Sequence, residues 1–237
     1  MRILITNDDG MGAQQLAELI RYCQKYGEVT TVVPKYEQSG KSHGIEIHRP
    51  FEAKVVELAP GITAWAVDST PADCVRFAIL GKGLEFDLVI SGVNRGLNIG
   101  ADIMYSGTVS AACEAANLGV KAIALSTPPE NYHLATRELD RIAIFVKERK
   151  LLELSNLYNI NIPANPKGIK ITRQGGPYYS DDFAPEENHM YRPCGKPVWV
   201  DRNDYTLDTD ATLNGYITVT PLTINRTDLR VFEMLTK

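Results

Sequence analysis

The sequence has few cysteines, and their spacing does not predict a disulfide framework. Four cysteines are spread over 237 residues, and no two of them form a C-x-x-C pair. Because three of the four lie in apolar, helix-like contexts, we expect buried free thiols and no disulfides or zinc site. Free thiols are typical of a reducing compartment, so the expected location is the cytoplasm. The four positions are Cys23, Cys74, Cys113 and Cys194.

Long hydrophobic runs and a strong net charge are also missing. No apolar stretch approaches the roughly 18 residues of a transmembrane helix, and the first residues form a strand-like run in place of a signal-peptide h-region. The net charge of −4 gives no general attraction to nucleic acid or to an anionic membrane. Neither a P-loop motif nor a G-x-G-x-x-G after a strand occurs, which disfavours those nucleotide-binding classes. We therefore expect no membrane and no nucleic-acid duplex as a partner.

Short apolar runs alternate with helical patterns along the first two thirds of the chain. Apolar spacing of three and four predicts helices over residues 14–26 and 139–152, and two more helices are expected to begin near Thr70 and Thr108. This alternation is typical of an α/β fold with a mostly parallel sheet flanked by helices. The predicted strands of this sheet are residues 3–6, 29–33, 88–90 and 122–125. Residues 45–48, 53–58 and 63–67 are expected to form a small antiparallel ribbon inserted in the pattern.

The composition changes from about residue 163, where glycine, proline and aromatic residues become frequent and strands become short. A clear strand is predicted at residues 216–220, and Thr227 and Asp228 should open a short terminal helix. We therefore expect an α/β catalytic core over residues 1–162. Residues 163–237 are expected to be a β-rich segment that completes the same structural domain and forms an arm.

Two adjacent carboxylates follow directly after the first apolar run, in the sequence Asn7-Asp8-Asp9-Gly10. Open α/β sheets bind ligands at the carboxyl ends of their strands, and uncompensated charges at such an end repel one another and resist burial. A hard divalent cation would remove this repulsion. The alternative is that Asp8 and Asp9 cap the following helix, which is a common position for aspartate.

Two further loops can reach the same edge of the sheet. The first strand of a doubly wound sheet usually lies beside the strand that begins its second half, at about 4.8 Å, and that strand leads into the loop of Asn94. The loop of Ser39 leaves the neighbouring second strand. Asp8, Asp9, Ser39 and Asn94 could thus supply four oxygen donors, a set that favours Mg²⁺, Mn²⁺ or Ca²⁺ over zinc or copper.

A second candidate site is the helix start Tyr105-Ser106-Gly107-Thr108-Val109, which follows a glycine-rich loop. Backbone N–H groups and hydroxyls at a helix N-terminus can bind an anion, although an ordinary Ser/Thr cap gives the same pattern. Metal ligands beside an anion site indicate phosphoryl chemistry. Lys41 and Arg95 could pair with phosphate or be solvated surface charges, and His43 could be a proton donor or a structural histidine.

Six ordered blocks resemble the SurE (survival protein E) family, and together they spread over nearly the whole chain. They are I-L-I-T-N-D-D-G at residues 3–10, Q-S-G-K-S at 38–42, P-A-D-C-V at 71–75, S-G-V-N-R-G-x-N-x-G at 91–100, Y-S-G-T-V at 105–109 and G-Y-I-T-V-T-P-L at 215–222. The family consists of metal-dependent phosphatases acting on nucleoside 5′-monophosphates. The resemblance implies a Rossmann-like core, one Mg²⁺ or Mn²⁺ per active site, and a C-terminal arm used for homodimer and often homotetramer contacts.

The resemblance also implies roles for individual residues, each at the matching position of this sequence. On the hypothesis of a metal-activated water, we expect Asp8 or Asp9 to orient or deprotonate the water that attacks phosphorus. The implied metal ligands are Asp8, Asp9, Ser39 and Asn94, and the implied phosphate-side residues are Asn98, Ser106, Gly107 and Thr108.

Two other functions are compatible with parts of this pattern. A haloacid-dehalogenase-like phosphatase would use Asp8 as a covalent nucleophile, but such enzymes carry D-x-D and the acids here are adjacent. A nucleotide-binding regulatory protein without catalysis is the alternative from another class, and the intact set of candidate ligands argues against it.

Overall fold

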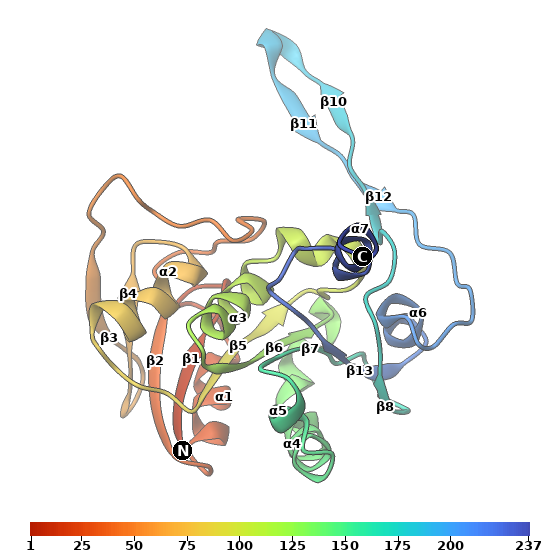
Figure 1. Cartoon of the computed structure of the whole chain (residues 1–237). Helices are drawn as coiled ribbons and strands as arrows, with labels where there is room; N and C mark the ends of the chain where they lie inside the picture. Colours follow the sequence, from red (N-terminus) through yellow and green to blue (C-terminus); the bar gives the residue numbers. More distant parts are fainter.

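A nine-stranded sheet forms the centre of the computed structural model, which describes residues 1–237 (Figure 1). Its strands are β1 (Arg2–Thr6), β2 (Glu28–Pro34), β3 (Ala53–Ala59), β4 (Ile62–Val67), β5 (Leu88–Arg95), β6 (Lys121–Thr127), β7 (Leu157–Asn161), β8 (Gly168–Ile171) and β13 (Tyr216–Pro221). Their order is β3-β4-β2-β1-β5-β6-β7-β13-β8. The six strands from β4 to β7 are parallel, whereas β3, β13 and β8 run the opposite way. The predicted α/β fold with a mostly parallel sheet is confirmed, including the pairing of β1 with β5.

Helices cover both faces of this sheet. α1 (Leu16–Cys23) and α4 (Leu139–Glu148) pack on one face, and α2 (Pro71–Arg76) and α3 (Gly107–Asn117) pack on the other. Because side chains alternate along a strand, Ile3 and Ile5 join the core of the first face and Leu4 joins the second. The remaining helical segments are η1 (Phe77–Gly81), η2 (Gly100–Tyr105), η3 (Pro129–Glu138), α5 (Leu151–Leu154), η4 (Glu187–His189), α6 (Asp208–Leu213) and α7 (Leu229–Leu235).

Some predicted elements differ from the structure. The ribbon is the hairpin of β3 and β4 alone, and β4 also pairs with β2 and so extends the main sheet. Residues 45–48 were expected to be a strand, but the backbone N–H of Glu46 donates to Asp73 (2.7 Å), and the Glu46 carboxylate accepts from His48 N (2.8 Å). Residues 45–47 are irregular, and the chain bends at His48 and Arg49. The helix expected over 139–152 is divided in two at Lys150, which has φ of 52°. The helix expected over 14–26 is shorter, as α1.

The connection from β6 to β7 has an unusual hand. α1 links β1 to β2, and α3 links β5 to β6, which is the opposite direction along the sheet. Because these two helices also lie on opposite faces, the two connections have the same hand. α4 links β6 to β7 in the same direction as α3, yet it packs on the face of α1. This crossover therefore has the hand opposite to the usual right-handed one. The intervening η3 reaches toward α1, where Thr136 donates to Glu18 at 3.0 Å.

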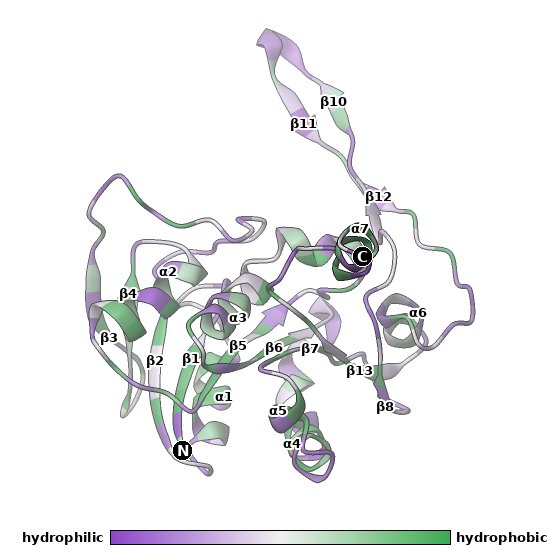
Figure 2. Ribbon diagram, viewed as in Figure 1, coloured by the Kyte–Doolittle hydropathy of each residue, from purple (hydrophilic) through white to green (hydrophobic).

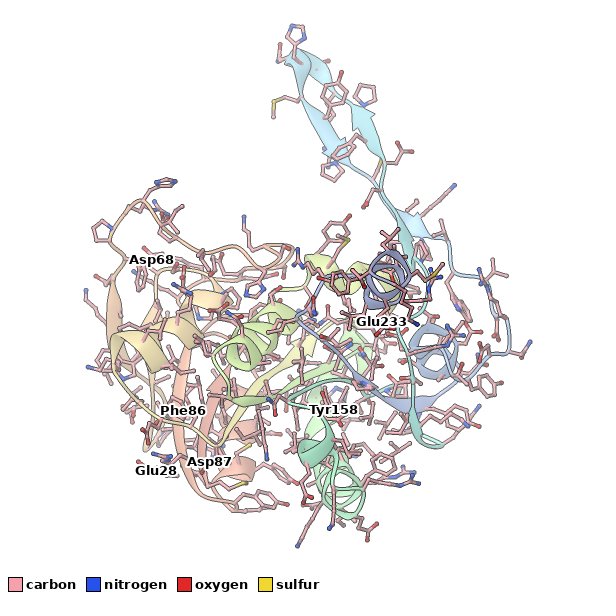
Figure 3. The ribbon with its side chains drawn as sticks, in the orientation of Figure 1. Glu28, Asp68, Phe86, Asp87, Tyr158 and Glu233 are labelled. Atoms are coloured by element: carbon pink, nitrogen blue, oxygen red, sulfur yellow. The ribbon has the colours of Figure 1, made fainter.

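The C-terminal segment attaches to the sheet through β13 and β8 and to the loop after β5 through one buried carboxylate. Asp208 accepts hydrogen bonds from the backbone N–H groups of Gly100 (3.1 Å) and Gly175 (2.7 Å) and is fully buried. A short four-stranded extension, β9 (Tyr179–Ser180), β10 (Phe183–Pro185), β11 (Tyr191–Pro193) and β12 (Lys196–Pro197), projects away from this body as the arm (Figure 1). The side chains of β10 and β11 are exposed on both sides of the ribbon (Figure 3).

All four cysteines are free thiols, as predicted, and two of them are buried. Burial raises the pKa of the Cys23 thiol to about 12, which makes it unreactive. No helix has the length and hydrophobicity to cross a membrane.

Candidate active site

Asp8 lies at the end of β1 and is almost completely buried, with 4% of its surface exposed. Its carboxylate accepts a hydrogen bond from the hydroxyl of Thr108, in the first turn of α3. Burial raises the pKa of Asp8, and the bond from Thr108 opposes part of that rise. The turn that aims this residue is held by Asn7, whose side chain bonds both the N–H (3.1 Å) and the C=O (3.0 Å) of Gly10.

Asp9 is less buried and faces the end of β5. One of its oxygens accepts from the backbone N–H of Arg95 at 3.2 Å, directly beside Asn94. Burial and the neighbouring charge of Asp8 raise the pKa of Asp9 to about 6. On the other side lies Tyr132 of η3, whose pKa burial and the nearby Asp9 carboxylate raise to about 12.

Ser39 comes from the loop after β2. Asn94 was expected in a loop after a strand of residues 88–90, but it lies in β5, which continues to Arg95 and pairs Asn94 with Ser126. Neither residue bonds the aspartates directly. The Ser39 hydroxyl donates to Glu37 at 2.7 Å, and the Asn94 amide donates to the C=O of Gly96 at 2.8 Å. The loop of Ser39 is nevertheless tied to the site, because the N–H of Gln38 donates to the C=O of Asp8 at 2.8 Å. Asn94 keeps its amide oxygen available, and Ser39 its oxygen lone pairs.

The start of α3 lies against Asp8. A Cβ atom on Gly107 would come within 2.9 Å of the Cβ and 3.1 Å of Oδ2 of Asp8, so only glycine fits without a shift. The Ser106 hydroxyl accepts from the N–H of Val109 at 3.1 Å, which makes Ser106 the N-cap of the helix. The capping alternative for the S-G-T pattern is therefore correct for the side chain of Ser106.

Asn98 belongs to a polar cluster at the carboxyl ends of β6 and β7. Its amide nitrogen donates to the hydroxyl of Ser126 at 2.8 Å, and its backbone C=O accepts from Asn159 and Asn161, both at 2.8 Å. Because an amide has two N–H groups, the second remains for another acceptor. Asn98 is thus fixed by its neighbours and can still donate.

His43 belongs to a partly buried polar cluster around the Glu114 carboxylate. Its Nε2 donates to Glu114 of α3 at 2.8 Å, and Arg76 of α2 donates to the same carboxylate at 3.0 Å. The bond from His43, followed by that from Arg76, holds the pKa of Glu114 below its ordinary value in spite of burial. The cluster ties the loop of Ser39 and α2 to α3, which is the structural alternative considered for this histidine.

The donor set fits a hard divalent cation. Burial raises the pKa of both carboxylates and so disfavours their charged forms. A cation between them would offset both the desolvation and the repulsion. No group of three or more His, Cys, Asp or Glu side chains is arranged to hold a metal. Neutral oxygen donors, such as the Ser39 hydroxyl and the Asn94 amide, would therefore have to complete the coordination.

One acidic and one aromatic neighbour of the site, Glu37 and Tyr132, were not predicted from the sequence. The Glu37 carboxylate raises the pKa of both aspartates, and Tyr132 borders Asp9. Glu37 could have been noticed, since it lies two residues before Ser39 in the same loop. No local signal marks Tyr132, because its position depends on the unusual crossover after β6.

Comparison with known proteins gives consistent similarities over the whole chain. The family model described as survival protein SurE matches residues 3–181. A protein named 5′-nucleotidase SurE from Pelotomaculum thermopropionicum is 39% identical over 100% of this chain and 95% of its own length. A protein of the same name from Desulforamulus reducens is 41% identical over 96% of this chain and 94% of its own length. The crystal structure of the SurE protein from Aquifex aeolicus is 30% identical and superposes with a TM-score of 0.78, covering 100% of this chain and 98% of that one.

Replacing Gly107 by alanine should displace either Asp8 or the start of α3. We expect Gly107→Ala to lower the free energy of unfolding by about 1–3 kcal/mol, the usual range for overpacking a core, measured by urea denaturation. Gly12→Ala is the matched control, since a Cβ at Gly12 meets nothing within 4 Å. Equal stability of the two variants would show that Asp8 and α3 are not in contact.

The Glu114 cluster should contribute to the pH dependence of stability. Since the pKa of Glu114 is lower in the folded protein, its contribution is complete above the unfolded value of about 4.3 and is lost as the pH falls through the folded value. We expect Glu114→Gln to be less stable at neutral pH and to lose less further stability between pH 5 and pH 3, as measured by urea denaturation. Equal slopes in the variant and the unmodified protein would contradict this.

Proposed function

The chain belongs to the SurE family, and on that premise we propose that it is a 5′-nucleotidase that hydrolyses nucleoside 5′-monophosphates to nucleosides and phosphate. The observation that supports the proposal is the contact of the Asp8 carboxylate with the start of α3, which would place the proposed cation site beside the proposed anion site. The names and the full-length identity of the relatives support the same activity.

We propose Asp8, Asp9, Ser39 and Asn94 as the residues that hold one Mg²⁺ or Mn²⁺ per subunit. When bound, such a cation neutralises phosphate oxygens and lowers the pKa of a coordinated water. Asp8 has one oxygen engaged by Thr108 and is almost completely buried, whereas Asp9 is more exposed. Asp9 is therefore the better placed of the two to orient the attacking water and accept its proton.

The phosphoryl group is proposed to lie at the N-terminus of α3. The first N–H groups of a helix have no partner within it, so those of Gly107 and Thr108 can donate to phosphate oxygens. The Thr108 hydroxyl has one hydrogen and gives it to Asp8, so this side chain positions the aspartate. The second N–H of Asn98 adds a donor from the loop after β5, and Ser106 holds the helix start in place.

A covalent aspartyl-phosphate mechanism is disfavoured by the position of Asp8. A nucleophile has to reach phosphorus, and this carboxylate is 4% exposed and hydrogen-bonded to Thr108. Asp8 is better suited to hold a cation than to attack the substrate.

The arm and α7 are proposed to form contacts between copies of the chain, giving a homodimer or homotetramer. Both carry large apolar side chains in contact with solvent, and α7 is largely apolar (Figure 2). Exposed apolar groups of this kind are typical of interaction surfaces. The most exposed of them are Phe183, Met190 and Tyr191 on the arm and Leu229, Phe232, Met234 and Leu235 on α7. A cytoplasmic location is proposed on the free thiols alone.

Asp8→Asn should remove activity and leave the fold intact. Changing a residue that only orients a metal ligand costs about 10–100-fold, so we expect a loss of more than about 100-fold in phosphate release from AMP with saturating Mn²⁺. Mn²⁺ affinity, measured by calorimetry, should fall as well. Because a buried charge is removed, the midpoint of urea unfolding should stay the same or rise. Unmodified turnover with Mn²⁺ would refute the metal assignment.

Polar substitutions on the arm should dissociate the oligomer. We expect the double variant Phe183→Ser with Tyr191→Ser to sediment near the 26.3 kDa of one chain, whereas the unmodified protein sediments at two or four times that mass. Ile144→Ser on α4 is the matched control, since Ile144 is also exposed. A monomeric unmodified protein, or a double variant of unchanged mass, would exclude the arm as an interface.

A further inference from the structure

A cavity of about 590 Å³ lies beside the candidate active site, over the carboxyl ends of β6 and β7. Leu97, from the loop after β5, and Glu130 of η3 line one side, and Tyr178 and Tyr179 of the arm line another. Leu97 adjoins the proposed phosphate residue Asn98, and Glu130 is two residues from Tyr132, which borders Asp9. The same two segments therefore belong to both the cavity and the site of chemistry.

The aromatic wall of this cavity is held in place. One oxygen of the Asp102 carboxylate accepts from the backbone N–H groups of Tyr178 (3.2 Å) and Tyr179 (2.9 Å). The two rings meet edge to face, with centroids 4.9 Å apart and an interplanar angle of 87°. Tyr178 is half-buried, and burial together with the charges of its neighbours Tyr179 and Glu130 raises its pKa. A fixed ring with a carboxylate nearby suits a ligand that has both a flat apolar part and hydroxyl groups.

The spacing also suits a substrate that reaches from one site to the other. The aspartates follow β1 and lie against the end of β5, and the cavity lies over β6 and β7, two to three strands from β1 in the sheet. Two to three strand spacings are roughly 10–14 Å, close to the length of a nucleoside monophosphate. A second cavity, on the other side of Asp8 at Lys41 and Arg49, measures only about 240 Å³ and contains no aromatic residue.

We propose that the larger cavity binds the nucleoside part of the substrate, with the base against the ring of Tyr178 and the sugar hydroxyls donating to Glu130. The volume is within the usual range for small-molecule sites, roughly 300–1,000 Å³. The inference rests on the proposed nucleotidase function and assigns to it the residues that distinguish a nucleotide from other phosphate esters.

The kinetic test compares AMP with ribose 5-phosphate, which lacks the base. Loss of one base–aromatic contact typically weakens binding at least several-fold, so Tyr178→Ala should lower the ratio of kcat/KM for AMP to that for ribose 5-phosphate about tenfold. Tyr178→Leu keeps the packing volume and should lower the ratio too. Tyr26→Ala, at the amino end of the sheet and 41% exposed, is the control and should not change it. A ratio that stays the same in both Tyr178 variants overturns the proposal.

Direct binding of adenosine separates this proposal from the proposed function. Adenosine has the base and the sugar but no phosphate, so calorimetry with it requires no turnover. We expect measurable binding to the unmodified protein, about tenfold weaker binding to Tyr178→Ala and unchanged binding to Tyr26→Ala. Absence of adenosine binding, or equal binding to all three proteins, overturns the nucleoside site. Failure to release phosphate from any nucleotide would instead overturn the nucleotidase function.

Discussion

The hydrogen bond between the hydroxyl of Thr108 and the buried carboxylate of Asp8 is the contact on which the site depends. It joins the end of the first strand to the start of α3, which are in direct contact at this point. The absence of a side chain at Gly107 permits the approach, since any Cβ there would meet Asp8. A carboxylate buried in this way is unfavourable alone, and the proposed cation and the helix terminus are both means of stabilising it.

The C-terminal segment fixes the backbone of residues that follow β5. Asp208 bonds the backbone of Gly100, and Asp102 bonds the backbone of Tyr178, so the glycine-rich loop after β5 is held between the sheet and the arm. This loop contains Asn98 and follows directly on Asn94 and Arg95 at the end of β5. The β-rich segment therefore helps to position residues of the candidate site. The proposed nucleoside cavity is formed in the same place, where this segment meets the core.

Much of the fold could be predicted from the sequence because the signals are local. An apolar run ends at the aspartates, and Thr70 caps α2 as its sequence indicates. The convergence of the loops after β1, β2 and β5 follows from the topology of doubly wound sheets. Tyr132 could not be placed, since its position depends on the hand of the β6–α4–β7 crossover, which no short segment encodes. The strand expected at residues 45–48 failed because a buried acid on α2, Asp73, bonds the backbone of Glu46.

The long sequence separation between Asp8 and Thr108 also determines when the two residues can meet during synthesis. Asp8 and Thr108 are separated by 100 positions, and ribosomes add roughly 5–20 residues per second. The carboxylates at the end of β1 therefore leave the ribosome about 5–20 s before the hydroxyl that bonds them. For most of that interval the strand lacks β5 (Leu88–Arg95), and throughout it the strand lacks α3, so a nascent chain from which Thr108 has not yet emerged holds both acids without the helix start that completes their site.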